Sequence, residues 1–158
     1  MVFAQNVLAV LMALPVCWAD RGDPRKPEQL ATVAEAISVV ANDSRDPIDK
    51  ASKLIAIFRW EGVGCLAVHS GQHKGRGRGL YQLEGQSRRY AGPFVGLDYP
   101  STLNATRVAG DVLDHSYQCG SRPADVFTAY GARACGSNWK TLRERVQTYR
   151  WASWRLSR

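Results

Sequence analysis

Apolar residues recur at helical spacing along most of this chain and predict a mainly α-helical fold. A first amphipathic helix is expected over residues 28–43, and a second from Pro47 to Glu61. Asp46 supplies an N-cap for the second helix, and Pro47 suits its first turn. The apolar positions of the two helices are Leu30, Val33, Ile37 and Val40, then Ile48, Ala51, Leu54, Ile55 and Phe58.

The C-terminal half carries three further helical patterns separated by glycine and proline. Ser101 is the expected N-cap of the first of them. Residues 81–83 suit a short strand or an extended turn. The predicted fold class is therefore mainly α, with at most a small strand or extended segment near the Gly-rich loop. The three expected helices run from Ser101 to residues 117–120, from Pro123 through Tyr130, and from Ser137 to about Trp154.

The first 27 residues differ in character from the rest of the chain. An apolar run from Val7 to Val16 precedes Ala19 and a charged stretch, which is typical of a secretory signal peptide cleaved after Ala19. The first six residues lack Lys and Arg, so a buried or interfacial N-terminal helix is the alternative. The charged, Pro-rich residues 20–27 predict a linker, and residues 28–155 a single folded domain.

Charge indicates the kind of partner. The 158 residues carry a formal net charge of +7, which favours an anionic partner such as a wall polymer, an acidic membrane surface or nucleic acid. Bases are concentrated in the loop at 74–89 and in the tail from Arg133. No nucleotide loop, metal site or cofactor is expected. The Gly-rich loop lacks Gly-Lys-Ser/Thr, and the glycines around His69 and His73 argue against a helix that presents both.

Four cysteines, Cys17, Cys65, Cys119 and Cys135, indicate an oxidising compartment. If Cys17 leaves with a signal peptide, three remain, which gives one disulfide and one leftover thiol. Pairing of Cys119 with Cys135 is favoured, because each lies at an expected helix boundary and together they flank residues 120–134. Pairing of Cys65 with either stays open.

Glu61 is the strongest candidate for chemistry. It ends an apolar helix beside Trp60, so its carboxyl is expected at the edge of the core. Burial disfavours the charged form and raises a carboxyl pKa, and a helix C-terminus acts in the same direction. A raised pKa suits a general acid. The alternative is a solvated carboxylate at a helix end.

Three segments in order carry a family resemblance: Glu61 at a helix end, Gly79-Leu80-Tyr81-Gln82-Leu83, and Ala129-Tyr130-Gly131. They resemble the soluble lytic transglycosylase branch of the lysozyme-like superfamily, which shows Glu-Ser, Gly-Leu-x-Gln-hydrophobic and Ala-Tyr-Asn in this order. The resemblance covers most of residues 28–152. Gly62 stands where the family usually has Ser, and Gly131 where it usually has Asn.

The resemblance implies a peptidoglycan lytic transglycosylase with a lysozyme-like domain. Glu61 would be the single general acid/base that cleaves the β-1,4 bond between N-acetylmuramic acid and N-acetylglucosamine. The implied protein is a monomer without a cofactor, exported to the periplasm or cell wall, or a phage-associated lysin. Its expected partners are glycan strands, with anionic wall polymers as further candidates. The substrate-binding residues would be Gly79, Leu80, Tyr81, Gln82 and Tyr130, with the Tyr130 hydroxyl close to Glu61.

Three alternatives stay open at this point. A lysozyme-type muramidase would use Glu84 or Asp98 as a second carboxylate to place a water. A non-catalytic wall-binding module would keep Glu61 for structure, and Gly62 and Gly131 favour it. A basic nucleic-acid-binding protein is disfavoured by the signal-like N-terminus and the cysteines, so no nucleic acid is expected as a partner.

Overall fold

The computed structural model describes residues 2–15, 17–61, 64–72, 79–83, 95–132, 135 and 139–158, except the side chains of 131, 132 and 139–141. Within these ranges the protein is mainly helical, and Leu83 forms an isolated β-bridge rather than a strand. The prediction of a mainly α fold is confirmed at this level. The elements are α1 Val2–Met12, η1 Trp18–Asp20, α2 Lys26–Asn42, α3 Pro47–Glu61, α4 Leu66–His69, α5 Tyr99–Ser116, η3 Tyr117–Cys119, α6 Pro123–Ala132 and α7 Trp139–Leu156.

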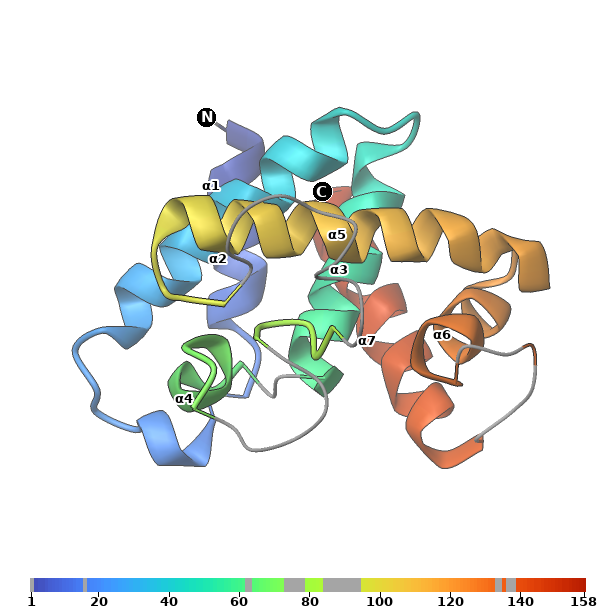
Figure 1. Ribbon diagram of the computed structural model, residues 1–158. Helices are drawn as coiled ribbons and strands as arrows, with labels where there is room; N and C mark the ends of the chain where they lie inside the picture. Colours follow the sequence, from blue (N-terminus) through green and yellow to red (C-terminus); the bar gives the residue numbers. More distant parts are fainter. Residues whose placement is uncertain are drawn as a thin grey trace.

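Helix α3 lies at the centre of the molecule. Every residue from Lys50 to Phe58 is buried, as expected for a helix that is covered on all sides. It packs against α2, α5 and α7, and α5 crosses in front of it in Figure 1 while α7 passes behind. The element that carries Glu61 is therefore held by neighbours on several sides.

Two buried lysines tie α3 to α5 and η3. The Nζ of Lys50 donates to the Asp114 carboxylate at 2.5 Å. The Nζ of Lys53 donates to the Asp49 carboxylate at 2.6 Å and also contacts the Tyr117 hydroxyl. A buried ammonium is costly unless it is paired and hydrogen-bonded, so these contacts hold the helices in one register.

The helix starts test the capping predictions. Asp46 caps α3 as expected, and its Oδ1 accepts from the Asp49 backbone N–H at 3.0 Å. The Ser101 cap is wrong: Asp98 caps α5, and its Oδ1 accepts from the Ser101 N–H at 2.9 Å. The reason is that Pro100 favours the first helical turn, which moves the cap to the carboxylate before it.

Helix α1 is part of the hydrophobic core. Val7, Val10 and Leu11 are buried where α1 packs on α2 and α7. In the full chain this is the buried N-terminal helix that was the alternative to a signal peptide. Cleavage after Ala19 and the domain boundary at residue 28 stay predictions. None of the helices in the described ranges combines the length and apolar composition that a bilayer span requires.

Two disulfides join segments that are separate in the sequence. Cys119 pairs with Cys135, as predicted. Cys65 pairs with Cys17, a pairing that the sequence interpretation missed because it assigned Cys17 to a segment that is removed. With both bonds formed, all four cysteines are used. Two disulfides are typical of proteins in an oxidising compartment.

Candidate functional site

Glu61 ends α3 against the inner face of α7. Its side chain is only 18% exposed, and its Oε1 accepts from a terminal guanidinium nitrogen of Arg145 at 2.5 Å. Arg145 is itself 13% exposed, and its Nε is buried without a hydrogen-bond partner among the described residues. The candidate acid is therefore half of a partly buried ion pair.

Two influences act on the Glu61 proton in opposite directions. Burial raises the pKa of the Glu61 carboxyl above its ordinary value, and the charge and hydrogen bond of Arg145 lower it. Burial is the larger effect, so the net pKa is raised. The direction is the one expected from the apolar end of the helix, whereas no sequence pattern pointed to Arg145.

A second contact from α7 supports the end of α3. The indole N–H of Trp60 donates to the Thr148 hydroxyl at 2.8 Å. Arg145 and Thr148 lie three residues apart and so share one face of α7. The residue next to Glu61 and Glu61 itself are thus both bound by the same helix face, which restrains the carboxyl in position.

Residues 79–82 form a tight turn with little solvent access. Leu80 and Tyr81 are 1% and 0% exposed. Gln82 has φ 49, an uncommon left-handed conformation for a residue with a side chain. Its side-chain Nε2 donates to the Gly79 carbonyl at 3.1 Å, and the side chain is half-buried. Of the predicted binding residues in this turn, Gln82 is the one that reaches solvent.

Tyr130 of α6 connects this turn to the neighbourhood of Glu61. Its hydroxyl donates to the Tyr81 carbonyl at 3.1 Å, while the Tyr81 hydroxyl contacts Thr106 of α5 at 3.2 Å. Burial raises the pKa of Tyr130 well above its ordinary value, and the negative charge of Glu61 adds to this. Tyr130 therefore stays protonated in the electrostatic field of Glu61.

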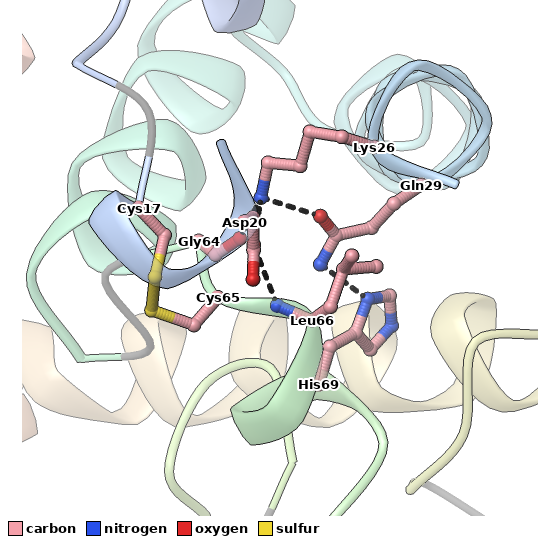
Figure 2. Close-up of a disulfide and its surroundings, with 8 residues drawn as sticks. All are labelled: Cys17, Asp20, Lys26, Gln29, Gly64, Cys65, Leu66 and His69. Atoms are coloured by element: carbon pink, nitrogen blue, oxygen red, sulfur yellow. Dashed lines mark hydrogen bonds and ion pairs between the residues drawn. A yellow bond between two sulfur atoms is a disulfide. The ribbon is translucent and has the colours of Figure 1, made fainter. Parts of the chain in front are cut away.

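The segment that follows Glu61 is anchored by a buried network beside the Cys17–Cys65 disulfide (Figure 2). The Nζ of Lys26 donates to the Asp20 carboxylate at 2.9 Å and to the Gln29 side-chain oxygen at 2.6 Å. It also contacts the Gly64 carbonyl, and Asp20 accepts from the Leu66 N–H at 2.8 Å. Residues 64–66 are thus fixed by groups from the N-terminal segment.

The same network sets the state of His69. Because the Gln29 oxygen accepts from Lys26, its amide nitrogen must donate to His69 Nδ1, 3.0 Å away. The ring proton is then on Nε2, which donates to the Thr102 hydroxyl at 3.0 Å. Burial, followed by the charge of Lys26, lowers the pKa of His69 to about 4. His69 is a neutral core residue with both nitrogens in use.

The two candidates for a second carboxylate have different outcomes. Asp98 is committed to capping α5, and hydrogen bonds from Ser101 lower the pKa of its carboxyl. Glu84 lies outside the described residues, as do Gly62, His73 and most of the Gly-rich basic loop. The described part of the chain therefore brings together Glu61, Arg145, Tyr130 and the 79–83 turn.

Two open hollows lie along the side of α7 that faces α6, with volumes of about 540 and 1150 Å³. Their shared described lining is Ala124, Leu142, Val146 and Arg150. The predicted site residues are absent from the described lining of both. These hollows therefore do not outline a substrate groove at Glu61.

Comparison of the chain with protein-family models, curated proteins and solved structures finds no match. The class that the fold supports is a mainly helical protein with two disulfides. Its particular activity rests on the chemistry of the residues around Glu61.

Proposed function

We propose that this protein is a peptidoglycan lytic transglycosylase that cleaves the β-1,4 bond between N-acetylmuramic acid and N-acetylglucosamine. The observation that carries the proposal is Glu61, a shielded carboxyl with a raised pKa at the end of a buried helix. Two further observations support it: the Tyr130 hydroxyl donates to the Tyr81 carbonyl in the 79–83 turn, and the charge of Glu61 contributes to the raised pKa of Tyr130.

In the proposed reaction one carboxyl does two jobs. Protonated Glu61 first donates its proton to the glycosidic oxygen, and the bond to the departing N-acetylglucosamine breaks. The Glu61 carboxylate then takes the proton of the muramic C6 hydroxyl, whose oxygen closes a 1,6-anhydro ring. Most glycosidases need two carboxylates. This route needs one, which agrees with the use of Asp98 as a helix cap.

The Glu61–Arg145 pair suits a carboxyl group that must be protonated in one step and ionised in the next. Burial favours the neutral acid that the first step consumes, and Arg145 favours the carboxylate that the second step consumes. General acid–base catalysis works best when the pKa of the group lies near the working pH. In this account Arg145 is a positioning residue that acts through Glu61.

The role proposed for the 79–83 turn is narrower than the resemblance implied. Leu80 and Tyr81 are in the core, so they shape the turn rather than touch a sugar. Gln82 keeps a half-buried amide that can bind an N-acetyl group or a hydroxyl. The left-handed backbone of Gln82 fits a residue held in place for binding, since such conformations cluster at functional sites.

One observation favours a second candidate, a non-catalytic wall-binding module. A close ion pair between Glu61 and Arg145 is also what a structural pair would look like. Export to the periplasm or cell wall is proposed for either candidate, on the basis of the two disulfides. A lysozyme-type hydrolase would require its second carboxylate outside the described residues.

Release of soluble fragments from dye-labelled peptidoglycan tests the role of Glu61. Glu61→Gln keeps the shape and an acceptor for Arg145 but loses the transferable proton, so release should fall at least about 100-fold. Glu35→Gln, an exposed substitution on α2, is the matched control and should keep full activity. Full activity of Glu61→Gln, with the thermal midpoint unchanged, would remove Glu61 from the mechanism.

A further inference from the structure

Helix α7 has two faces of different character. Its inner face carries Arg145 against Glu61, and further along it buries Ala152 and Leu156 in the core. Its outer face exposes residues at intervals of three or four, which places them in one line along the helix. This outer stripe consists of Arg143, Gln147, Arg150, Trp154 and Arg158.

The stripe is a straight basic surface with an aromatic group near one end. From Arg143 to Trp154 it extends about 16 Å at the rise of an α-helix, and Arg158 lies two residues past the end of α7 at Leu156. It contains three arginines and no acidic residue, and Arg155 is exposed beside it. Arg143, Gln147 and Arg150 also line the larger hollow beside α6. The charge of the stripe is complementary to an anionic surface.

Trp154 indicates which anionic surface fits. Trp154 is 48% exposed. The guanidinium carbon of Arg158 lies over its ring at 4.1 Å from the centroid, and that of Arg155 at 5.9 Å. An exposed indole flanked by arginines is typical of the membrane–water interface.

The N-terminus adds an apolar group at the same end of the molecule. In Figure 1 the start of α1 and the end of α7 both lie toward the upper side, and α1 contacts α7. Val2, the first residue of α1, is 72% exposed. Val2 is therefore exposed apolar surface on the helix that contacts α7, and such surface favours a lipid partner over a soluble polyanion.

We propose that the outer stripe of α7 docks the protein on an anionic membrane surface. Arg143, Arg150 and Arg158 contact lipid phosphates, and Trp154 enters the boundary between headgroups and acyl chains. The stripe lies on the opposite face of α7 from Arg145, so docking leaves the Glu61 side of the helix uncovered. This proposal does not depend on whether Glu61 cleaves peptidoglycan.

Co-sedimentation of the full chain with lipid vesicles tests the proposal. Vesicles of 30% phosphatidylglycerol in phosphatidylcholine should bind the protein, and vesicles of phosphatidylcholine alone should bind it far more weakly. The triple variant Arg143→Gln/Arg150→Gln/Arg158→Gln should weaken binding about 100-fold, since each basic residue near such a surface contributes roughly five-fold. Trp154→Ala should weaken it several-fold without a change in charge.

Two matched variants separate the stripe from net charge and from folding. Arg21→Gln/Arg45→Gln/Arg107→Gln removes three other exposed arginines and should bind almost as the unaltered protein does. A separate variant, Arg143→Lys/Arg150→Lys/Arg158→Lys, keeps the charge of the stripe and should bind the anionic vesicles again. Equal losses in the two Gln triples would overturn the proposal. The proposal would also be overturned if the protein bound soluble polyphosphate or DNA, lost that binding in the stripe variant, and did not bind anionic vesicles.

Discussion

Glu61 and Arg145 lie 84 residues apart in the sequence and meet at 2.5 Å in the fold. Burial alone would favour a carboxyl that rarely ionises, and a fully solvated ion pair would favour one that rarely holds a proton. The observed pair lies between these limits, with burial the larger effect. The proton affinity of Glu61 thus depends on Arg145, and a substitution of Arg145 should change it.

Replacing Arg145 with Gln removes the charge that opposes burial, so the pKa of Glu61 should rise further. A general acid works only while protonated, and its activity falls as the pH rises through its pKa. The high-pH limb of a kcat/KM profile should therefore move to higher pH in Arg145→Gln. Arg143→Gln, on the exposed face of α7, is the control and should leave the limb in place. A limb that stays put in Arg145→Gln would argue against this coupling.

His69 provides a stability prediction, because its pKa is about 4 in the folded protein against an ordinary value of 6.5. The unfolded chain binds the proton first on acidification, so the free energy of unfolding should fall between pH 6.5 and 4. The full contribution is about 3 kcal/mol. Urea unfolding across this range should show a weaker pH dependence in His69→Gln. The exposed His115→Gln should behave as the unaltered protein does, and an identical slope in all three would contradict the assignment.

At the residue scale the sequence was informative where the signal is local. The apolar run before Glu61 predicted a shielded carboxyl, and the side chain is 18% exposed. The partners of Glu61 and His69 were missed, because an arginine on an amphipathic helix looks the same whether it faces solvent or a buried carboxylate. Only the packing of α3 on α7 distinguishes Arg145 from Arg143.

Among the secondary-structure elements, helix periodicity gave α2, α3, α6 and α7 to within about two residues. The error at the start of α5 came from a choice between two capping residues, Asp98 and Ser101, that are hydrogen-bonded to each other. The role of α1 was harder, since an apolar run that ends in small residues suits both a signal peptide and a core helix. Val7 and Leu11 are buried by contacts with residues distant in the sequence, which no local pattern can predict.

The two disulfides connect different elements and should differ in effect. Cys17–Cys65 closes a loop with sequence separation 48 and Cys119–Cys135 one of 16, so chain entropy predicts losses of about 4 and about 3 kcal/mol on removal. Only Cys17–Cys65 borders the network that fixes residues 64–66 after Glu61. Cys17→Ser/Cys65→Ser should therefore lose activity at temperatures where Cys119→Ser/Cys135→Ser keeps it. Denaturant unfolding and fragment release, measured on both double variants, check this, and the reverse ranking would contradict it.

For the molecule as a whole, composition predicted a single basic domain with an anionic partner, and the structure adds where the charge lies. Part of the positive charge is internal, since Lys26, Lys50 and Lys53 are buried in ion pairs. The exposed share includes the α7 stripe, which is turned away from Arg145. The overall charge could not distinguish the buried, paired lysines from the exposed arginines, because burial and pairing depend on how the helices pack.

The most direct measurement of the central claim is mass spectrometry of the soluble products after the full chain is incubated with purified peptidoglycan. The unaltered protein should release muropeptides that end in 1,6-anhydromuramic acid, and Glu61→Gln should release none. This result would establish single-carboxylate chemistry at Glu61. Products with reducing ends would contradict it in favour of a hydrolase, and wall binding without any release by either protein would contradict catalysis altogether.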